Sequence, residues 1–218
     1  MQETPLERLR LSSLDPLECL AILPTMQTYA NRICPHIHIA LQSPLDSILR
    51  RMKRRYSAQD AIKALQATQG LYVGIDIITG FPGESTTDFQ ETYNLMQDLP
   101  WTRLHVFPYS ERSGTPATRL PNSVPLHERA GRRKTLTELS MKRQKSLMMT
   151  IQSTRTHLDR VLWEQPKDGW QSGHTPEYLR VLLPQGAHST PGSVSSVRII
   201  DQIYDRASAD ISFLGSLS

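Results

Sequence analysis

The chain has 218 residues, of which 38% are hydrophobic and 21% are charged, as is typical of a globular protein with a buried core. Its charge is uneven, because residues 1–150 contain 19 lysines and arginines against 14 acidic residues, whereas residues 151–218 contain 6 against 7. No apolar stretch has the length of a membrane span, and two cysteines give no disulfide framework. We therefore expect no membrane partner and a cytoplasmic location.

The first part of the chain alternates predicted strands with predicted helices. Residues 6–15 predict a strand and its exit loop, and residues 16–30 predict a helix that Pro24 interrupts. Apolar residues alternate with polar ones over residues 36–42, which indicates a second strand. About four strands joined by helices predict right-handed βαβ units and a parallel sheet. The remaining expected elements are strands at 74–80 and 104–107 and helices at 44–51, 57–69, 86–98 and 125–157.

The residue pattern of the sequence changes after residue 157. Short β-rich runs at 161–163, 178–183 and 194–203 alternate with loops rich in glycine, proline and serine. Regularly spaced short strands with turn residues between them are typical of a small barrel or sandwich.

The most informative segment is 74–84, with the sequence GIDIITGFPGE. A β-branched apolar run predicts a buried strand, and the turn that follows contains Gly80 and Gly83 on either side of a proline. Glycines allow a backbone to approach a ligand closely, and ligands bind at the carboxyl ends of parallel strands. The same residues also suit a tight strand-to-helix connection without a ligand.

Four further motifs surround this segment in order. They are residues 8–16 (RLRLSSLDP), 38–43 (HIALQS), 48–56 (ILRRMKRRY) and 104–117 (LHVFPYSERSGTPA). Together the five segments resemble the radical S-adenosylmethionine methylthiotransferases, which add a methylthio group to C2 of a modified adenosine in tRNA. They are most similar to the branch that acts on N6-threonylcarbamoyladenosine near the anticodon.

The resemblance implies an α/β fold in which an incomplete radical-SAM (TIM-like) parallel barrel is followed by a small β-barrel (TRAM-like) domain. Residues 1–150 then correspond to the carboxyl-terminal part of the radical SAM barrel, and residues 151–218 to the RNA-binding domain. The family holds a 4Fe-4S cluster on three closely spaced cysteines, whereas this chain has only Cys19 and Cys34. We therefore expect a chain that lacks the cluster-binding half, has no catalytic or metal-binding residue of its own, and is inactive unless a separate cluster-bearing amino-terminal half is supplied.

Two sets of binding residues follow from the resemblance. Arg54 matches the family's Met-x-Arg position, and a guanidinium there can clamp the methionyl carboxylate of S-adenosylmethionine. The cations of residues 50–55, which we call the basic cluster, also suit tRNA phosphates, although such a run is equally typical of a solvated helix face. The implied cofactor residues are Gln42, Ser43, Arg54, Gly80, Gly83, Glu84, His105 and Phe107. The implied substrate and RNA residues are Arg50, Arg51, Lys53, Arg55, Arg112, Thr115, Arg132 and Arg133.

Two other functions stay open at this point. The chain can be an RNA-binding remnant without catalysis, or part of the sister enzyme that methylthiolates an aspartate of a ribosomal protein. The form of the motif at 104–117 and the basic helices disfavour the sister enzyme.

Overall fold

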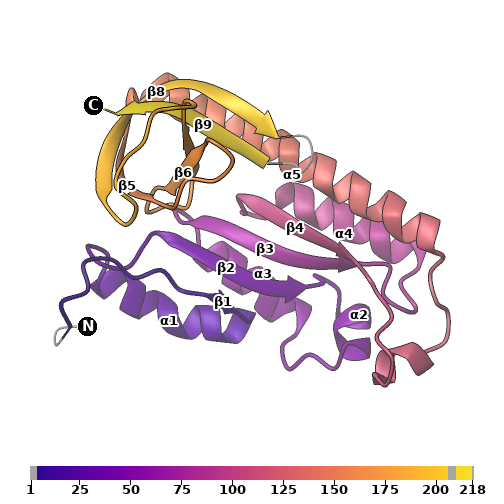
Figure 1. Ribbon diagram of the computed structural model, residues 1–218. Coiled ribbons are helices and arrows are strands. Elements are labelled where there is room, and N and C mark those ends of the chain that lie inside the picture. The colour runs from indigo at the N-terminus through magenta and orange to yellow at the C-terminus, as the bar shows by residue number, and fades with distance from the viewer. Residues whose placement is uncertain (1–3, 206–209, 218) are drawn as a thin grey trace. The chain divides into compact units, whose positions relative to one another are not determined.

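The computed structural model describes residues 4–205 and 210–217, which form two compact units (Figure 1). The main division lies between Ser140 and Met141, inside the long helix α5 (Leu126–Thr154), and the short segment Cys34–His36 groups with the second unit. The expected domain boundary was residue 150. We call the unit that ends at Ser140 the α/β unit and the unit that begins at Met141 the barrel unit.

The α/β unit contains one four-stranded sheet in the order β1-β2-β3-β4. The pairs β1–β2 and β3–β4 are parallel, and β3 aligns with β4 from Gly74 opposite Arg103 to Thr79 opposite Pro108. The predicted alternation of about four parallel strands with helices is confirmed. In chain order the elements are β1 (Ser13–Leu14), α1 (Pro16–Thr28), β2 (His36–Gln42), α2 (Asp46–Arg51), α3 (Ala58–Ala67), β3 (Tyr72–Thr79), α4 (Thr86–Asp98), β4 (Arg103–Pro108), the 3-10 helix η1 (Pro116–Arg119) and α5.

One face of this sheet forms the main hydrophobic core. Ile39 and Ile75 from the strands pack with Leu65, Met96 and Leu136 from helices α3, α4 and α5, and all five are fully buried. Each such side chain contributes about 1.5–3 kcal/mol when it leaves water. The alternate strand positions face the other side of the sheet and stay partly exposed, so polar side chains are tolerated there.

Three of the helices begin at capping boxes. In each, the cap side chain accepts a hydrogen bond from the third helical N–H, and the acid at that position accepts from the cap N–H. A cap of this kind stabilises a helix by about 0.5–2 kcal/mol. The pairs are Asp15 with Glu18, Ser57 with Asp60, and Ser85 with Asp88.

Two details of the predicted N-terminal elements are wrong. The strand expected over residues 6–15 is reduced to Ser13–Leu14, with an isolated bridge between Leu9 and Ile33. Helix α1 also continues through Pro24 to Thr28. Buried residues on both sides of this proline, Leu23 and Met26, anchor the helix to the core and outweigh the lost hydrogen bond.

The barrel unit closes five strands in the order β5-β6-β7-β9-β8. Trp163 and Phe213 fill its interior, and Gly173 leaves room for Trp163, because a Cβ there would lie 2.7 Å from the Trp163 ring. The expected small barrel is confirmed, although β6 and β9 were not among the predicted strands. The strands are β5 (His157–Trp163), β6 (Gln171–His174), β7 (Arg180–Leu183), β8 (Val194–Asp205) and β9 (Asp210–Leu217). In the described part of the chain no helix has the length and apolarity needed to cross a bilayer.

Candidate ligand site at the strand ends

Two adjoining pockets lie at the carboxyl ends of strands β2, β3 and β4. The larger has a volume of about 480 Å³, and we call it the strand-end pocket. The smaller has a volume of about 350 Å³, and we call it the basic pocket. Both include Ile78, Phe81, Thr115 and Ala117 in their walls, so the two pockets lie next to each other. Pockets of this size at this edge of a parallel sheet are the usual place for a small ligand.

Seven of the sixteen predicted binding residues line these pockets. The strand-end pocket includes Gln42, Phe107 and Arg112, whereas Arg51, Lys53 and Arg54 surround the basic pocket and Thr115 belongs to both. Gln42 has a φ of 61°, a left-handed conformation that is uncommon outside glycine and worth attention at a site.

The basic pocket combines three cations with an apolar floor. Met52, Ile78, Phe81 and Leu120 supply the floor. Such a surface suits an anion attached to an apolar group, because the charge meets the guanidinium or ammonium groups while the remainder is buried.

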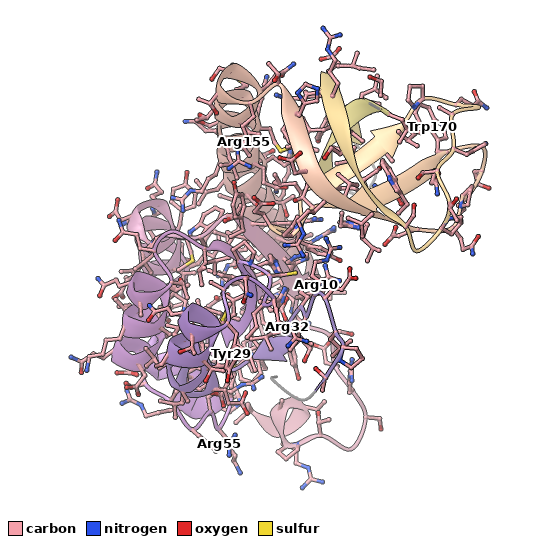
Figure 2. The ribbon with its side chains drawn as sticks, turned by 90° about the vertical axis from the view of Figure 1, so that its left-hand side faces the viewer. Arg10, Tyr29, Arg32, Arg55, Arg155 and Trp170 are labelled. Carbon is pink, nitrogen blue, oxygen red and sulfur yellow. The ribbon has the colours of Figure 1, made fainter. Side chains whose placement is uncertain are left out.

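Other members of the basic cluster lie outside the pockets. Arg50 is exposed. The Arg55 side chain is 82% exposed, as Figure 2 shows, and it contacts Asp15 at 3.4 Å. Their role in binding RNA stays a prediction. Ser43 is buried, and its hydroxyl accepts a hydrogen bond from the Leu45 N–H, which shapes the turn before α2.

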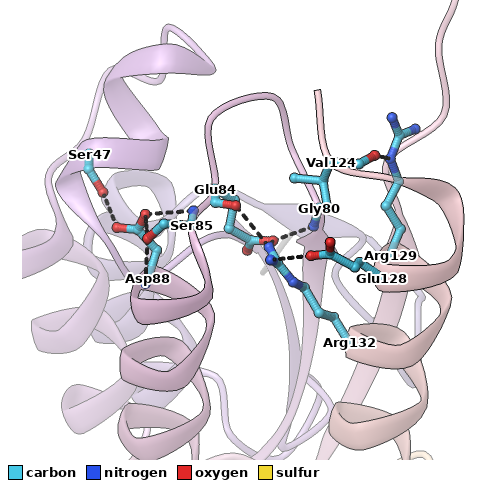
Figure 3. Close-up of polar contacts among 9 residues, drawn as sticks. All are labelled: Ser47, Gly80, Glu84, Ser85, Asp88, Val124, Glu128, Arg129 and Arg132. Carbon is cyan, nitrogen blue, oxygen red and sulfur yellow. Dashed lines mark hydrogen bonds and ion pairs between the residues drawn. The ribbon is translucent and has the colours of Figure 1, made fainter. Parts of the chain in front are cut away.

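Protein side chains fill the space around the turn that contains Gly80 and Gly83, which we call the glycine corner (Figure 3). Gly80 and Gly83 have φ values of 71° and 87°, so both need glycine for the turn itself. A Cβ at Gly80 would lie 2.4 Å from the Arg129 side chain, and a Cβ at Gly83 would lie 2.6 Å from the Arg51 guanidinium. The Gly80 N–H donates to Glu84 and the Gly83 N–H to Asn122. The structural reading of this corner, which the sequence left open, therefore accounts for both glycines.

Glu84 and Arg132 form a buried ion pair that the sequence did not predict. Their side chains are 4% and 8% exposed, and the Arg132 guanidinium donates to the Glu84 carboxylate at 2.7 Å and to its carbonyl at 2.9 Å (Figure 3). It also reaches Glu128 at 3.1 Å. Burial raises the pKa of the Glu84 carboxyl, while hydrogen bonds from Arg132 and Gly80 act against this rise. The Glu84 carboxylate is thus already bound inside the protein by Arg132 and the Gly80 N–H, and its contact with the cofactor stays a prediction.

The expectation that Arg132 faces RNA is corrected by the same contacts, because its charge is neutralised inside the protein. Its neighbour Arg133 is exposed and stays a candidate for RNA contact. The two residues differ because Arg132 lies on the buried stripe of α5 with Leu136 and Ser140, whereas Arg133 lies off it.

Arg129 is a second buried arginine, with 3% of its surface exposed. It donates to the Val124 carbonyl at 2.7 Å, to the Tyr109 carbonyl at 2.8 Å and to Ser123 and Glu111. The hydrogen bond to Glu111 lowers the pKa of that carboxyl. Arg129 therefore holds both ends of the segment 109–124, which forms one wall of the two pockets.

The sheet face opposite the core carries a polar trio that sequence reasoning did not assemble. His38 Nε2 lies 2.8 Å from the Asp76 carboxylate, and the ring of His105 lies 5.0 Å from the ring of His38. The predicted site residue His105 is therefore close to the strand-end pocket, of which Asp76 is a wall. The sequence did contain a signal for this trio, because side chains at every second position of a strand face the same side of the sheet. His38, Asp76 and His105 therefore face the same side as Gln42, Ile78 and Phe107, which lie at or near the ends of the same three strands.

The residues do not suit an iron–sulfur cluster. Cys19 and Cys34 are both buried, and burial raises the pKa of the Cys19 thiol to about 11. Within residues 4–205 and 210–217 no group of three or more His, Cys, Asp or Glu side chains is arranged to hold a metal ion. A 4Fe-4S cluster normally takes three or four thiolates, which this chain does not have.

Comparison with known proteins supports the resemblance seen in the motifs. Residues 8–96 match the radical SAM superfamily. The threonylcarbamoyladenosine tRNA methylthiotransferase MtaB of Chlamydia pneumoniae is 33% identical over 199 residues, which cover 89% of this chain and 46% of that protein. MtaB of Bacillus subtilis is 30% identical over 91% of this chain and 45% of its own length. The tRNA-2-methylthio-N(6)-dimethylallyladenosine synthase of Nitrosomonas eutropha is 36% identical over 89% of this chain and 44% of its own length.

A solved structure of Elp3 from Methanocaldococcus infernus covers 92% of this chain at 13% identity with a TM-score of 0.49, a likeness too loose to indicate a substrate. The chain spans about half the length of the curated relatives it matches. Those relatives are named for two different modified adenosines. The chain is therefore similar to radical S-adenosylmethionine methylthiotransferases over about half of their length.

Proposed function

We propose that this chain is the ligand-positioning and RNA-positioning part of a tRNA methylthiotransferase that adds a methylthio group to C2 of N6-threonylcarbamoyladenosine. The observation that carries the proposal is the pair of adjoining pockets, which brings seven predicted binding residues from separate segments to one edge of the sheet. The names of the relatives and the match of residues 8–96 support the same reading. With tRNA as substrate, the proposed place of action is the cytoplasm.

The pocket residues fit S-adenosylmethionine. Arg54 in the basic pocket suits its methionyl carboxylate, and the apolar residues Ile78 and Phe81 suit the flat face of its adenine. The Tyr109 hydroxyl at the wall of the strand-end pocket is shielded from solvent and has no hydrogen-bond partner among the described residues. A buried hydroxyl without a partner is costly, and a bound ligand can relieve that cost.

When bound, S-adenosylmethionine supplies the radical and methyl-transfer chemistry, while the protein binds, orients and excludes water. In this role Arg54 binds the methionyl end of the cofactor, and Gln42 and Phe107 face its adenosyl part. The segment 109–124 shields the ligand in the two pockets from solvent. Arg112 and Thr115 on that wall are the proposed contacts to the substrate. The residues of this chain do not fit an iron–sulfur cluster, so its proposed part in the reaction is positioning.

The barrel unit is the proposed TRAM-like tRNA-binding part. Trp170 lies at the surface of this unit and is 38% exposed (Figure 2), and Tyr178 is 39% exposed. Exposed aromatic rings of this kind suit stacking on unpaired bases. Arg50, Arg51, Lys53, Arg55 and Arg133 are the proposed phosphate contacts.

Binding of S-adenosylhomocysteine, a stable analogue of the cofactor, tests the proposal on the chain itself. Arg54→Met should weaken binding at least tenfold, since a charge-assisted hydrogen bond is worth about 1.5–3 kcal/mol and about 1.4 kcal/mol is tenfold. Arg50→Met is the matched control, because Arg50 is exposed and lies outside both pockets. Equal affinities for parent and Arg54→Met would overturn the assignment.

A second experiment tests the reaction. The chain alone should not methylthiolate tRNA, and addition of the cluster-bearing amino-terminal half of an MtaB relative should restore modification of threonylcarbamoyladenosine. An RNA-binding remnant, the second candidate function, is favoured by the missing cysteines. It predicts tRNA binding without any affinity for S-adenosylhomocysteine.

A further inference from the structure

We propose that Tyr56 is a positioning residue for ligand binding, because its buried hydroxyl holds the backbone at Gln42 in a strained turn and so keeps the Gln42 side chain at the wall of the strand-end pocket. This inference rests on the proposed function, since it takes a ligand in that pocket. It concerns a tyrosine that lines neither pocket and to which neither the motifs nor the names of the relatives assign a role.

The first support is the backbone at Gln42, the last residue of β2. Its φ is 61°, and across it the Ser43 N–H donates to the Leu41 carbonyl at 2.7 Å. A hydrogen bond between residues two apart, with a positive φ at the residue between them, is the rare and strained form of the γ-turn. Glycine would adopt this φ without a side-chain penalty, so the glutamine is retained at a cost in stability.

The strained positions of the α/β unit gather at the pockets. Among its described residues, three other than glycine have a positive φ, namely Gln42, Lys53 and Asn122. The first lines the strand-end pocket, the second lines the basic pocket, and Asn122 lies in the segment 109–124. Residues in such conformations cluster at ligand sites, and they persist only where the surrounding structure enforces them.

The contact that enforces the turn at Gln42 comes from Tyr56. Its hydroxyl lies 3.0 Å from the carbonyl oxygens of both Ala40 and Leu41 and donates a hydrogen bond that they share. The Leu41 carbonyl belongs to the planar peptide group that precedes Gln42, so its direction sets the φ of Gln42. The same oxygen accepts from the Ser43 N–H. Tyr56 therefore acts on the pocket through the Gln42 backbone.

Tyr56 is itself firmly held. It is 5% exposed, and burial raises the pKa of its hydroxyl to about 12, so the phenol keeps the proton that it donates. It directly precedes Ser57, the cap of helix α3, and the Ala58 N–H donates to the Asp46 carboxylate of α2 at 2.7 Å. The hydroxyl is thus a fixed point to which the end of β2 is tied.

The Gln42 amide suits the proposed ligand. A primary amide both donates and accepts hydrogen bonds, so it can serve the hydroxyl groups and ring nitrogens of an adenosyl ligand. A backbone that is already held in the binding geometry reduces the ordering that the ligand has to impose. Strain at Gln42 in the free protein is therefore exchanged for tighter binding.

Binding of S-adenosylhomocysteine to the full chain tests the role of Tyr56. Tyr56→Phe removes only the hydroxyl and should weaken binding by about twofold to tenfold, the range that the loss of one neutral hydrogen bond allows. Tyr93→Phe, at a partly buried tyrosine of α4 outside both pockets, is the matched control and should leave the affinity unchanged. Amide hydrogen exchange measured by NMR should become faster at Ser43 in Tyr56→Phe and stay as in the parent in the control.

Gln42→Gly separates positioning from general stability. Glycine relieves the strain, so the melting temperature should not fall, whereas binding should weaken because the amide is lost. In this background Tyr56→Phe should have no further effect on affinity, since the side chain through which Tyr56 acts is already gone. A purely structural tyrosine would lower the affinity by the same factor in both backgrounds.

The inference is overturned if Tyr56→Phe binds as tightly as the parent, or if it loses the same factor with and without Gln42. It is also overturned if Gln42→Gly keeps the parental affinity or melts at a lower temperature, and this variant carries the test if Tyr56→Phe does not fold. Each of these results leaves the proposed function standing, because the parent still binds S-adenosylhomocysteine. A parent without affinity for that ligand refutes the inference and the proposed function together.

Discussion

Replacement of Arg132 by methionine should destabilise the α/β unit strongly. Methionine keeps much of the length and volume of the side chain but leaves Glu84 buried without its cationic partner. Breaking a buried ion pair by removing one partner costs about 3–5 kcal/mol, a large part of the about 5–15 kcal/mol that stabilises a typical domain. The neighbouring exposed residue provides the control, since Arg133→Met should change stability by no more than about 0.5 kcal/mol.

The pH dependence of this loss has a definite sign. Burial already raises the pKa of Glu84, and the hydrogen bond from Arg132 is the largest influence that lowers it. The variant therefore raises this pKa further. A carboxyl with a raised pKa in the folded state favours folding fully below its unfolded pKa, and this contribution is lost as the pH rises through the folded pKa. The cost of Arg132→Met should accordingly be greatest at neutral pH and should shrink on acidification, when Glu84 takes up a proton.

Urea denaturation followed by helical circular dichroism measures this effect, because helices α1 to α4 all lie in the α/β unit. A double variant supplies the internal check. Glu84→Gln combined with Arg132→Met should be more stable at neutral pH than Arg132→Met alone, since no buried charge is then left unpaired. The reasoning fails if Arg132→Met costs no more than Arg133→Met, or if its cost is the same at acidic and neutral pH.

Three further outcomes follow from the same contacts. Gly80→Ala should lower the melting temperature more than Gly114→Ala. Both positions have a positive φ, which costs about 1–2 kcal/mol for an L-residue, but only a Cβ at Gly80 would meet a side chain, that of Arg129. Equal losses of stability would contradict this packing. The chain should stay colourless after iron–sulfur reconstitution, and a brown product with about four irons per chain, the content of one 4Fe-4S cluster, would contradict this. Binding of tRNA should weaken linearly in log affinity against log salt, and alanine at the first three cations of the basic cluster should flatten that slope; an unchanged slope would show that these cations do not contact RNA.

The fold was largely predictable because its signals are local. The alternating apolar residues of β2 and β3 and the capping boxes at Ser57 and Ser85 all lie within a few residues of the elements they specify. The sequence also predicted a ligand at the strand ends, where the structure has two pockets, since the ends of parallel strands meet at one edge of a sheet. The strands β6 and β9 were missed because a small barrel is closed by pairing between distant segments, and such pairing leaves little trace in short runs.

The interior of the site was less predictable, because its partners are distant in sequence. Glu84 and Arg132 are 48 positions apart, and a run of arginines on a helix looks like a solvated surface when it is considered alone. The spacing of these residues along α5 did indicate burial, because Arg129 and Arg132 lie on the same face of the helix as the buried Leu136. A charged residue on the apolar stripe of a helix must find a buried partner, since an unpaired charge there is costly.

Gly80 and Arg129 show that a glycine near a ligand site can influence binding indirectly, through another side chain. Gly80 lacks a Cβ where the Arg129 side chain lies, and Arg129 in turn holds the wall 109–124 of the pockets. Gly80→Ala should therefore weaken S-adenosylhomocysteine binding even though the ligand need not touch this glycine. Because the alanine acts by displacing Arg129, its effect on affinity should largely disappear when Arg129 is already methionine. Full additivity of the two changes would instead show that Gly80 faces the ligand directly, as the glycine-rich turn first suggested.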